Sequence, residues 1–210
     1  MAYIGNFPTS PGFTAINFKM NNQIKKTVTA SGRTIRATNS TTLWSGILKY
    51  PPMTLSEFLP IQGFLSRCQG GLNEFDVTMP TVSQNSLGLT GLSIQVNSTV
   101  SAGATSVSIT NGPNSTLILN PGDVIRFPNH SKVYMVTDDA GVTTDGTGNA
   151  TINFEPAALV EIPPASASSS GDTIITDEVP FRMILSNDIQ EMGYRTDGLV
   201  GYELDVQEVI

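Results

Sequence analysis

The segment spanning residues 42–80 carries a complete strand–helix–strand pattern, and it constrains the fold more than any other part of the chain. It opens with bulky residues of the kind that line a pleated strand. Pro51-Pro52 ends that strand, because proline cannot donate a hydrogen bond to a β-ladder. The T-x-x-E spacing of Thr54 and Glu57 predicts a capping box at the start of a helix. We expect Pro60 to interrupt or kink this helix, which should therefore be short.

The predicted helix covers residues 54–68 and has one apolar face. Its apolar residues recur at the three- and four-residue spacing of an amphipathic helix. Gly70-Gly71 ends it, and a strand with alternating apolar residues follows. Cys68 is the only cysteine, so we expect no internal disulfide, no cysteine-based zinc site and a buried thiol. The residues predicted to form the core of this unit are Trp44, Phe58, Ile61, Phe64 and Phe75.

Composition favours an all-β protein. Charged residues make up only 14% of the chain, while serine, threonine, asparagine and glycine are abundant. Low charge with many threonine and valine residues is typical of β folds rich in turns. The first residues show no basic stretch before an apolar one, and no apolar run approaches the ~18 residues that a membrane span requires. We therefore expect an all-β protein with one short helix, without a signal peptide or a membrane segment.

Turn signals and composition divide the chain into two β-rich parts. Short strand candidates at regular spacing fill residues 88–163, which predicts a small sandwich or barrel. The Ser-rich segment 164–173 has the composition of a linker. We predict that residues 1–87 and 174–210 form one β-sandwich, and that 88–163 is a module inserted into it.

The first β-rich stretch, residues 13–50, reads as a β-meander. Three strand candidates, FTAINFKM, KKTVTA and RTIRAT, precede the tryptophan-bearing strand, and Ser31-Gly32 supplies a turn. Their polar alternation predicts one buried face and one solvated face.

Charge is distributed unevenly along the chain. Residues 1–67 hold seven lysines and arginines and one acid, whereas residues 68–210 hold four and seventeen, giving net charges of +6 and −13. Such asymmetry is typical of proteins that associate, although two ordinary solvated surfaces would also produce it. The basic part lacks the interleaved aromatic residues of a nucleic-acid site. The predicted interface residues are Lys25, Lys26, Arg33 and Arg36.

The strand–helix–strand unit resembles the hub domain of phage distal tail proteins. That domain reads as a Trp-bearing strand ending in Tyr-Pro, a helix with a Glu-Phe pair, a Gly-rich turn and a strand ending at proline. The resemblance covers roughly half of the chain and rests on patterns of shape rather than on chemical signatures. The matching residues are Phe18 to Met20, Ser31 to Arg33, Trp44, Tyr50-Pro51, Glu57-Phe58, Gly70-Gly71, Phe75 to Pro80 and Val179 to Leu185.

This resemblance implies a structural virion protein of the phage tail tip, assembled in the host cytoplasm. It implies a homohexameric ring that joins the tail tube to the baseplate or tail hub and surrounds the DNA channel. The implied partners are other copies of the chain, the tail tube protein and the tail hub or baseplate proteins. DNA would pass through without sequence-specific binding, and no membrane or cofactor is implied.

Catalytic and metal-binding patterns are weak, so we do not expect an enzyme. His130 is the only histidine and lies in a polar loop, without the G-x-S-x-G elbow of a serine hydrolase. Asp138, Asp139 and Asp145 offer oxygen ligands for Ca²⁺, but their spacing is not that of an EF-hand loop. No glutamate closes the loop, so we prefer a turn-rich hairpin as the explanation of these residues. We predict no catalytic, metal or cofactor residues.

An alternative function is a carbohydrate-binding or adhesin-like β module in residues 88–163. Sugar sites favour exposed aromatic rings, and this segment offers only Phe127, Tyr134 and Phe154. All three occupy strand positions that are typical of the core. Trp44 could stack on a sugar, but a single tryptophan inside a strand next to a helix is more typical of a core residue.

Overall fold

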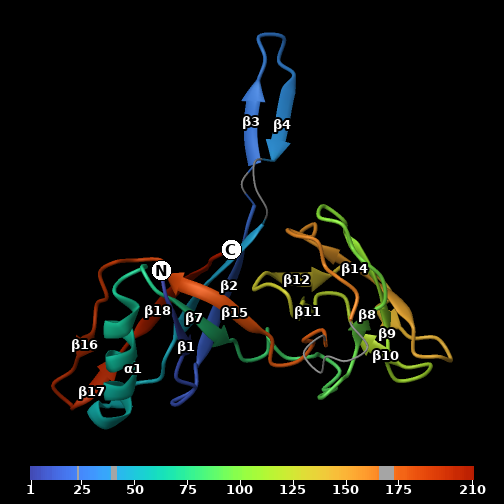
Figure 1. Ribbon diagram of the computed structural model, residues 1–210. Helices are drawn as coiled ribbons and strands as arrows, with labels where there is room; N and C mark the ends of the chain where they lie inside the picture. Colours follow the sequence, from blue (N-terminus) through green and yellow to red (C-terminus); the bar gives the residue numbers. More distant parts are fainter. Residues whose placement is uncertain (23, 39–41, 166–172) are drawn as a thin grey trace.

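The protein folds as an all-β chain with one helix among the residues that the structure describes. The structure is a computed structural model, and it describes residues 1–22, 24–38, 42–165 and 173–210. The predicted fold class, all-β with one short helix, is confirmed. The chain forms a hub, an outer module beside it and a projecting hairpin (Figure 1). No helix in the described part of the chain is long and apolar enough to cross a membrane.

A six-stranded sheet forms the hub, in the order β1-β7-β15-β18-β5-β2. The C-terminal strands β15 and β18 lie in the middle of this sheet, antiparallel to each other, and each pairs with an N-terminal strand. The outer strands β1 and β2 form the two edges. The strands are β1 (Tyr3–Asn6), β2 (Ala15–Asn21), β5 (Leu43–Lys49), β7 (Glu74–Thr78), β15 (Pro180–Leu185) and β18 (Glu203–Glu208).

One face of the hub sheet is buried and the other is mostly open. In strands β5, β15 and β18, buried residues alternate with exposed or partly exposed ones, as a half-buried antiparallel sheet requires. The buried face carries Leu48, Met183 and Leu204, which are all fully enclosed. On the open face lie Lys19, Lys49 and other polar side chains.

Helix α1 (Leu55–Cys68) covers part of the buried face and runs without a break. The expectation that Pro60 interrupts it is wrong. The missing N–H of Pro60 removes one helical hydrogen bond and costs ~3 kcal/mol, whereas each apolar side chain buried by the helix contributes ~1.5–3 kcal/mol. Five buried residues on one face therefore outweigh the proline: Phe58, Ile61, Phe64, Leu65 and Cys68.

The ends of α1 follow the predicted signals. The backbone N–H of Thr54 donates to the Glu57 carboxylate at 2.8 Å, and this bond lowers the pKa of Glu57. At the other end Gln69 adopts a left-handed conformation, and Gly70 follows it with positive φ. A small three-stranded sheet lies beside the helix and consists of β16 (Gly193–Tyr194), β17 (Leu199–Gly201) and β6 (Met53–Thr54).

The outer module comprises strands β8 to β14 and has a hydrophobic core of its own. Its five-stranded sheet has the order β11-β12-β14-β9-β8, and β10 pairs with β13. Its strands are β8 (Gln95–Val96), β9 (Ser106–Thr110), β10 (Leu117–Leu119), β11 (Val124–Arg126), β12 (Val133–Val136), β13 (Val142–Thr143) and β14 (Ala150–Glu155).

The chain returns from the outer module later than the predicted boundary at residue 174. Thr173 bridges Gln95, Ile175 bridges Arg126, and Ile174 is buried in the outer core. The backbone of residues 173–175 therefore still pairs with the outer module, while the Ile175 side chain already packs against the hub core. Within the predicted linker 164–173, residues 166–172 lie outside the described residues.

The predicted meander over residues 13–50 is wrong. Strand β2 pairs directly with β5 along its whole length, from Ala15 opposite Lys49 to Asn21 opposite Leu43. The two strands between them, β3 (Ile24–Val28) and β4 (Thr34–Thr38), pair only with each other and leave the sheet as a hairpin. Figure 1 shows this hairpin projecting from the body. We call residues 24–38 the arm.

Candidate functional site

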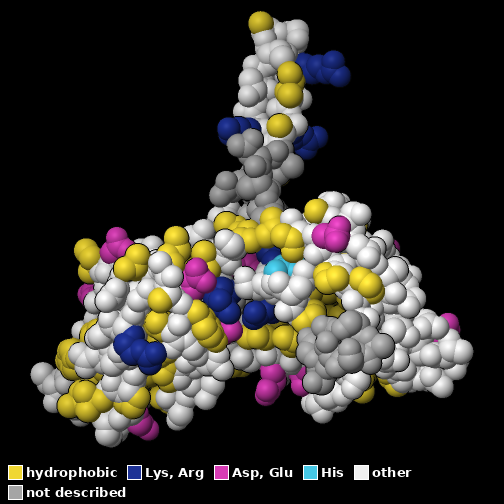
Figure 2. Space-filling model, in the orientation of Figure 1, with side chains coloured by type: hydrophobic (Ala, Val, Ile, Leu, Met, Phe, Trp, Pro, Cys, Tyr) yellow, Lys and Arg dark blue, Asp and Glu magenta, His cyan; other side chains and the backbone are white. Residues whose placement is uncertain are grey.

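The arm exposes apolar and cationic side chains together. Every side chain of β3 is exposed, which overturns the prediction of one buried face here. Ile24 is 51% exposed, Val28 66% and Ile35 54%. Figure 2 shows hydrophobic and cationic side chains distributed along the arm. An isolated two-stranded hairpin is marginally stable in water, so this arm is of the kind that a partner stabilises.

The predicted interface residues all lie on the arm. Lys25 and Lys26 lie on β3, Arg36 lies on β4, and Arg33 follows the turn. That turn is closed by the Thr29 N–H bond to the Arg33 carbonyl at 2.9 Å. None of the four cations forms an ion pair with another described residue.

The two faces of the arm follow from its register. Lys26 lies directly opposite Arg36, and Val28 lies opposite Thr34. Opposite residues in an antiparallel pair share a face, so Ile24, Lys26, Val28 and Arg36 form one surface. We call these four residues the arm face. The Lys26–Arg36 pair places like charges across the strands, which destabilises the hairpin unless anions lie nearby.

A groove of about 670 Å³ lies at the far end of the open sheet face. We call it the end groove. Its walls combine carboxylates with exposed isoleucine: Glu191, Glu203 and Asp205 lie beside Ile47 and Ile189, and Ile189 is 86% exposed. Lys49 also lines the groove and pairs with Glu203 at 2.8 Å, leaving the other two carboxylates without an ion pair among the described residues.

A buried polar cluster fixes the outer module to the hub. The Lys132 ammonium pairs with the Glu208 carboxylate, and both side chains are fully enclosed. Glu208 also accepts hydrogen bonds from the backbone N–H groups of Trp44 and Val133, each at 3.1 Å. Burial raises the pKa of Glu208 and lowers that of Lys132, while their mutual attraction opposes both shifts.

Trp44 forms an apolar part of the contact between the hub and the outer module. Its indole N–H donates to the Val133 carbonyl at 2.8 Å, and its ring stacks on Phe18 at 5.1 Å between centroids. Val124 and Val133 of the outer module belong to the hub core. The hub sheet therefore buries one end of its inner face against the outer module and the other end against α1.

A second ion cluster links the modules near β7. Asp76 is 8% exposed and accepts from the Arg182 guanidinium at 2.6 Å, and Arg126 of the outer module lies 3.8 Å away. Arg126 also donates to the Pro180 carbonyl at 2.9 Å. Because these partners come from both modules, the cluster restricts their relative orientation.

The only histidine, His130, which was considered as a catalytic base, forms hydrogen bonds within the outer module. His130 lies between Asn129, 2.8 Å from Nδ1, and the Tyr134 hydroxyl, 2.7 Å from Nε2. Burial, with the nearby cations Arg126 and Lys132, lowers the pKa of His130 to about 4. The imidazole is therefore neutral at pH 7 and accepts or donates within this network.

Two of the aspartates considered as calcium ligands, Asp138 and Asp145, accept hydrogen bonds from backbone N–H groups. Asp145 Oδ1 accepts from the backbone N–H groups of Thr147 and Asn149 at 2.8 and 2.9 Å, and these bonds lower its pKa to about 2. Asp138 contacts Asn153 in the same way. No group of three or more His, Cys, Asp or Glu side chains able to hold a metal occurs in the described part of the chain.

The predicted core residues Trp44, Phe58, Ile61, Phe64 and Phe75 are all at most 6% exposed, and Cys68 is buried with a pKa raised to about 11. The aromatic residues considered for sugar binding, Phe127, Tyr134 and Phe154, are fully enclosed in the outer core. The surface of the outer module therefore offers none of these three rings for stacking on a sugar.

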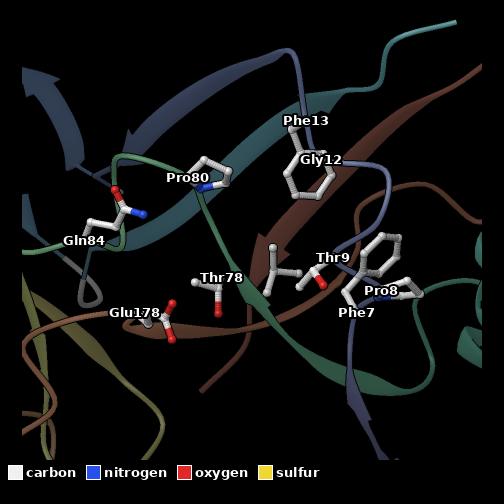
Figure 3. Close-up of a pocket in the computed structure, with 10 residues that line it drawn as sticks. Phe7, Pro8, Thr9, Gly12, Phe13, Thr78, Pro80, Gln84 and Glu178 are labelled. Atoms are coloured by element: carbon white, nitrogen blue, oxygen red, sulfur yellow. The ribbon is translucent and has the colours of Figure 1, made fainter. Parts of the chain in front are cut away.

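A smaller apolar cavity of about 170 Å³ lies at the β1 edge of the hub. The rings of Phe7 and Phe13 line one side, and Gln84 and Glu178 face it from the other (Figure 3). Phe7 packs on Phe64 and Phe75 at 5.1 and 5.6 Å between centroids, so this cavity borders the hub core.

Sequence reasoning missed the ion clusters between the modules. Their members lie far apart along the chain, so no spacing joins them. One signal was available: in β18, Glu208 follows Leu204 and Val206 at positions that alternation assigns to the buried face. A carboxylate at such a position requires a buried partner.

No family model matches the sequence, and no curated protein sequence matches it.

Proposed function

We propose that this protein is a structural component of a phage tail tip, and that its copies assemble into a ring around the DNA channel. The resemblance of the strand–helix–strand unit to distal tail proteins motivates the proposal. Six copies would join the tail tube to the baseplate or tail hub. The outer module would face outward from the ring.

One observation carries the assembly part of the proposal, namely the exposed arm. Within the described residues, three large apolar side chains and four cations project on a hairpin that the body does not cover. Burying an apolar side chain of this size contributes ~1.5–3 kcal/mol, so association with another chain can stabilise the arm substantially. The rest of the chain supplies the opposite charge, because the chain carries −7 in total and the arm +4.

Sedimentation velocity on the full chain and on a variant with the arm replaced by a short Gly-Ser turn tests this role. We expect the full chain to associate and the arm variant to remain monomeric. Trp44 fluorescence should be the same in both, because the tryptophan lies in the hub core. A full chain that stays monomeric at every concentration contradicts the proposal, as does equal association of the two proteins.

A further inference from the structure

We infer that the arm face of one copy binds the end groove of a neighbouring copy. This inference rests on the proposed function, since it names the surface that the arm would contact in a ring. It assigns a role to the end groove, in which two of the three carboxylates, Glu191 and Asp205, form no ion pair with another described residue.

Chemical complementarity supports this pairing. The arm face presents two cations and two apolar side chains, Lys26 and Arg36 with Ile24 and Val28. The end groove presents carboxylates beside exposed isoleucine. The carboxylates would offset the repulsion between Lys26 and Arg36, and the isoleucines would cover the arm's apolar residues.

Two other hollows fit the arm less well. The apolar cavity at the β1 edge has one carboxylate, Glu178, and a volume of about 170 Å³. A hollow of about 500 Å³ beside Leu92 contains Asp177 and Glu178, but Asp177 already accepts a hydrogen bond from the Asn85 backbone. The end groove is the largest of the three and carries the most carboxylates.

A protein surface fits the arm face better than nucleic acid does. Phosphate binding uses cations and backbone N–H groups, and base binding uses aromatic rings. Ile24 and Val28 satisfy neither requirement, and the arm contains no aromatic residue. Apolar side chains beside cations, as Ile24 and Val28 lie beside Lys26 and Arg36, are typical of a contact with a protein surface that is both acidic and apolar.

The geometry requires two different copies. The arm leaves the sheet after Asn21 and returns before Leu43, whereas the end groove contains Thr14 and Lys49 at the other end of the same strand pair. At about 3.3 Å per residue, these ends are separated by roughly 20 Å. Figure 1 shows the arm pointing away from the body, so in this structure it does not lie on its own groove.

An arm and a groove at opposite ends form a heterologous, head-to-tail contact. Such contacts generate a closed ring when the rotation between copies closes, and a filament when it does not. The same contact therefore explains how identical copies could build a ring without a second type of interface.

Charge-swap association tests the inference in the full chain. Variant A carries Lys26→Glu and Arg36→Glu, and variant B carries Glu191→Lys and Asp205→Lys. We expect each variant alone to associate at least about tenfold more weakly than the wild type, since attractive pairs become repulsive. An equal mixture should recover association, because alternating copies bring every arm to a groove of opposite charge.

Matched controls separate this contact from a general charge effect. A variant with Lys25→Glu and Arg33→Glu changes the arm's charge equally, but neither residue lies on the arm face. A variant with Asp139→Lys and Glu161→Lys changes exposed acids of the outer module. Both controls should associate more strongly than variants A and B.

Cross-linking gives a direct readout. If the arm face binds the end groove, a short bismaleimide should join Val28→Cys on one copy to Ile189→Cys on another. The native Cys68 should not compete, because it is buried and its raised pKa suppresses reaction. Ser98→Cys in place of Ile189→Cys should give no cross-link.

The outcomes separate this inference from the proposed function. A wild-type chain that never associates contradicts both. If the wild type associates but variant B does so normally, or the mixture fails to recover, the groove assignment is wrong while ring assembly stands. A cross-link to Ser98→Cys as strong as that to Ile189→Cys also overturns the assignment.

Discussion

Stability should depend strongly on both partners of the buried Lys132–Glu208 pair being present, and Lys132→Met tests this. Methionine keeps the apolar stem but removes the ammonium, leaving the Glu208 carboxylate enclosed with only two backbone N–H donors. Removing one partner of a buried ion pair costs ~3–5 kcal/mol. We expect a loss of stability in that range at pH 8.

The loss should depend on pH with a defined sign. Burial without a cation raises the folded-state pKa of Glu208 above its unfolded value of about 4.3. The folded variant then binds more protons than the unfolded chain, so its stability falls as pH rises through this window. The variant should therefore lose less stability at pH 5 than at pH 8.

Replacing both partners provides the control. Glu208→Gln combined with Lys132→Met removes both charges, and the glutamine oxygen can still accept from the backbone of Trp44 or Val133. We expect the double variant to be more stable than either single variant, which gives a large coupling energy in the cycle.

Urea unfolding measured by tryptophan fluorescence is the appropriate assay, because the only tryptophan is Trp44 and it touches this cluster. A loss below about 1 kcal/mol for Lys132→Met at pH 8 would refute the account of the cluster. A double variant as unstable as the two single losses added together would refute the coupling.

Three further predictions concern the hub and its assembly. Phe64→Ala should cost ~3–5 kcal/mol in urea unfolding, because Phe64 packs on Phe7 and Phe75; a loss under ~1 kcal/mol would mean that this face is not core. Replacing residues 88–163 with a Gly-Ser linker should destabilise the hub, because Trp44 and Glu208 lose their cover; an unchanged unfolding midpoint would contradict the shared core. Raising salt to molar levels should slow ring assembly without dissolving rings already formed, since charge pairs are screened and apolar contacts are not; complete dissociation in sedimentation would contradict this.

Local signals in the sequence were sufficient for the helix and its surroundings. The T-x-x-E spacing, the apolar stripe through Phe58, Ile61 and Phe64, and the glycines after Gln69 each act over a few residues. Such signals determine local structure without reference to the rest of the chain. Pro60 was misjudged because tertiary burial outweighs a local penalty.

Strand pairing between distant segments was harder to predict from the sequence. The alternation in β3 and β4 resembles that of β2, yet only β2 joins the sheet. Alternation indicates that a strand has two faces, but it does not identify what covers them. The arm cations were predicted as interface candidates from charge asymmetry, whereas the end groove joins residues from four separate stretches of the chain and has no signature in the sequence.

Images of the purified protein by electron microscopy test the proposed ring most directly. We expect closed rings of identical subunits with a central opening. The outer modules should appear as lobes at the periphery, and arm-shortened protein should show no rings. Single particles of monomer size at every concentration would contradict the account.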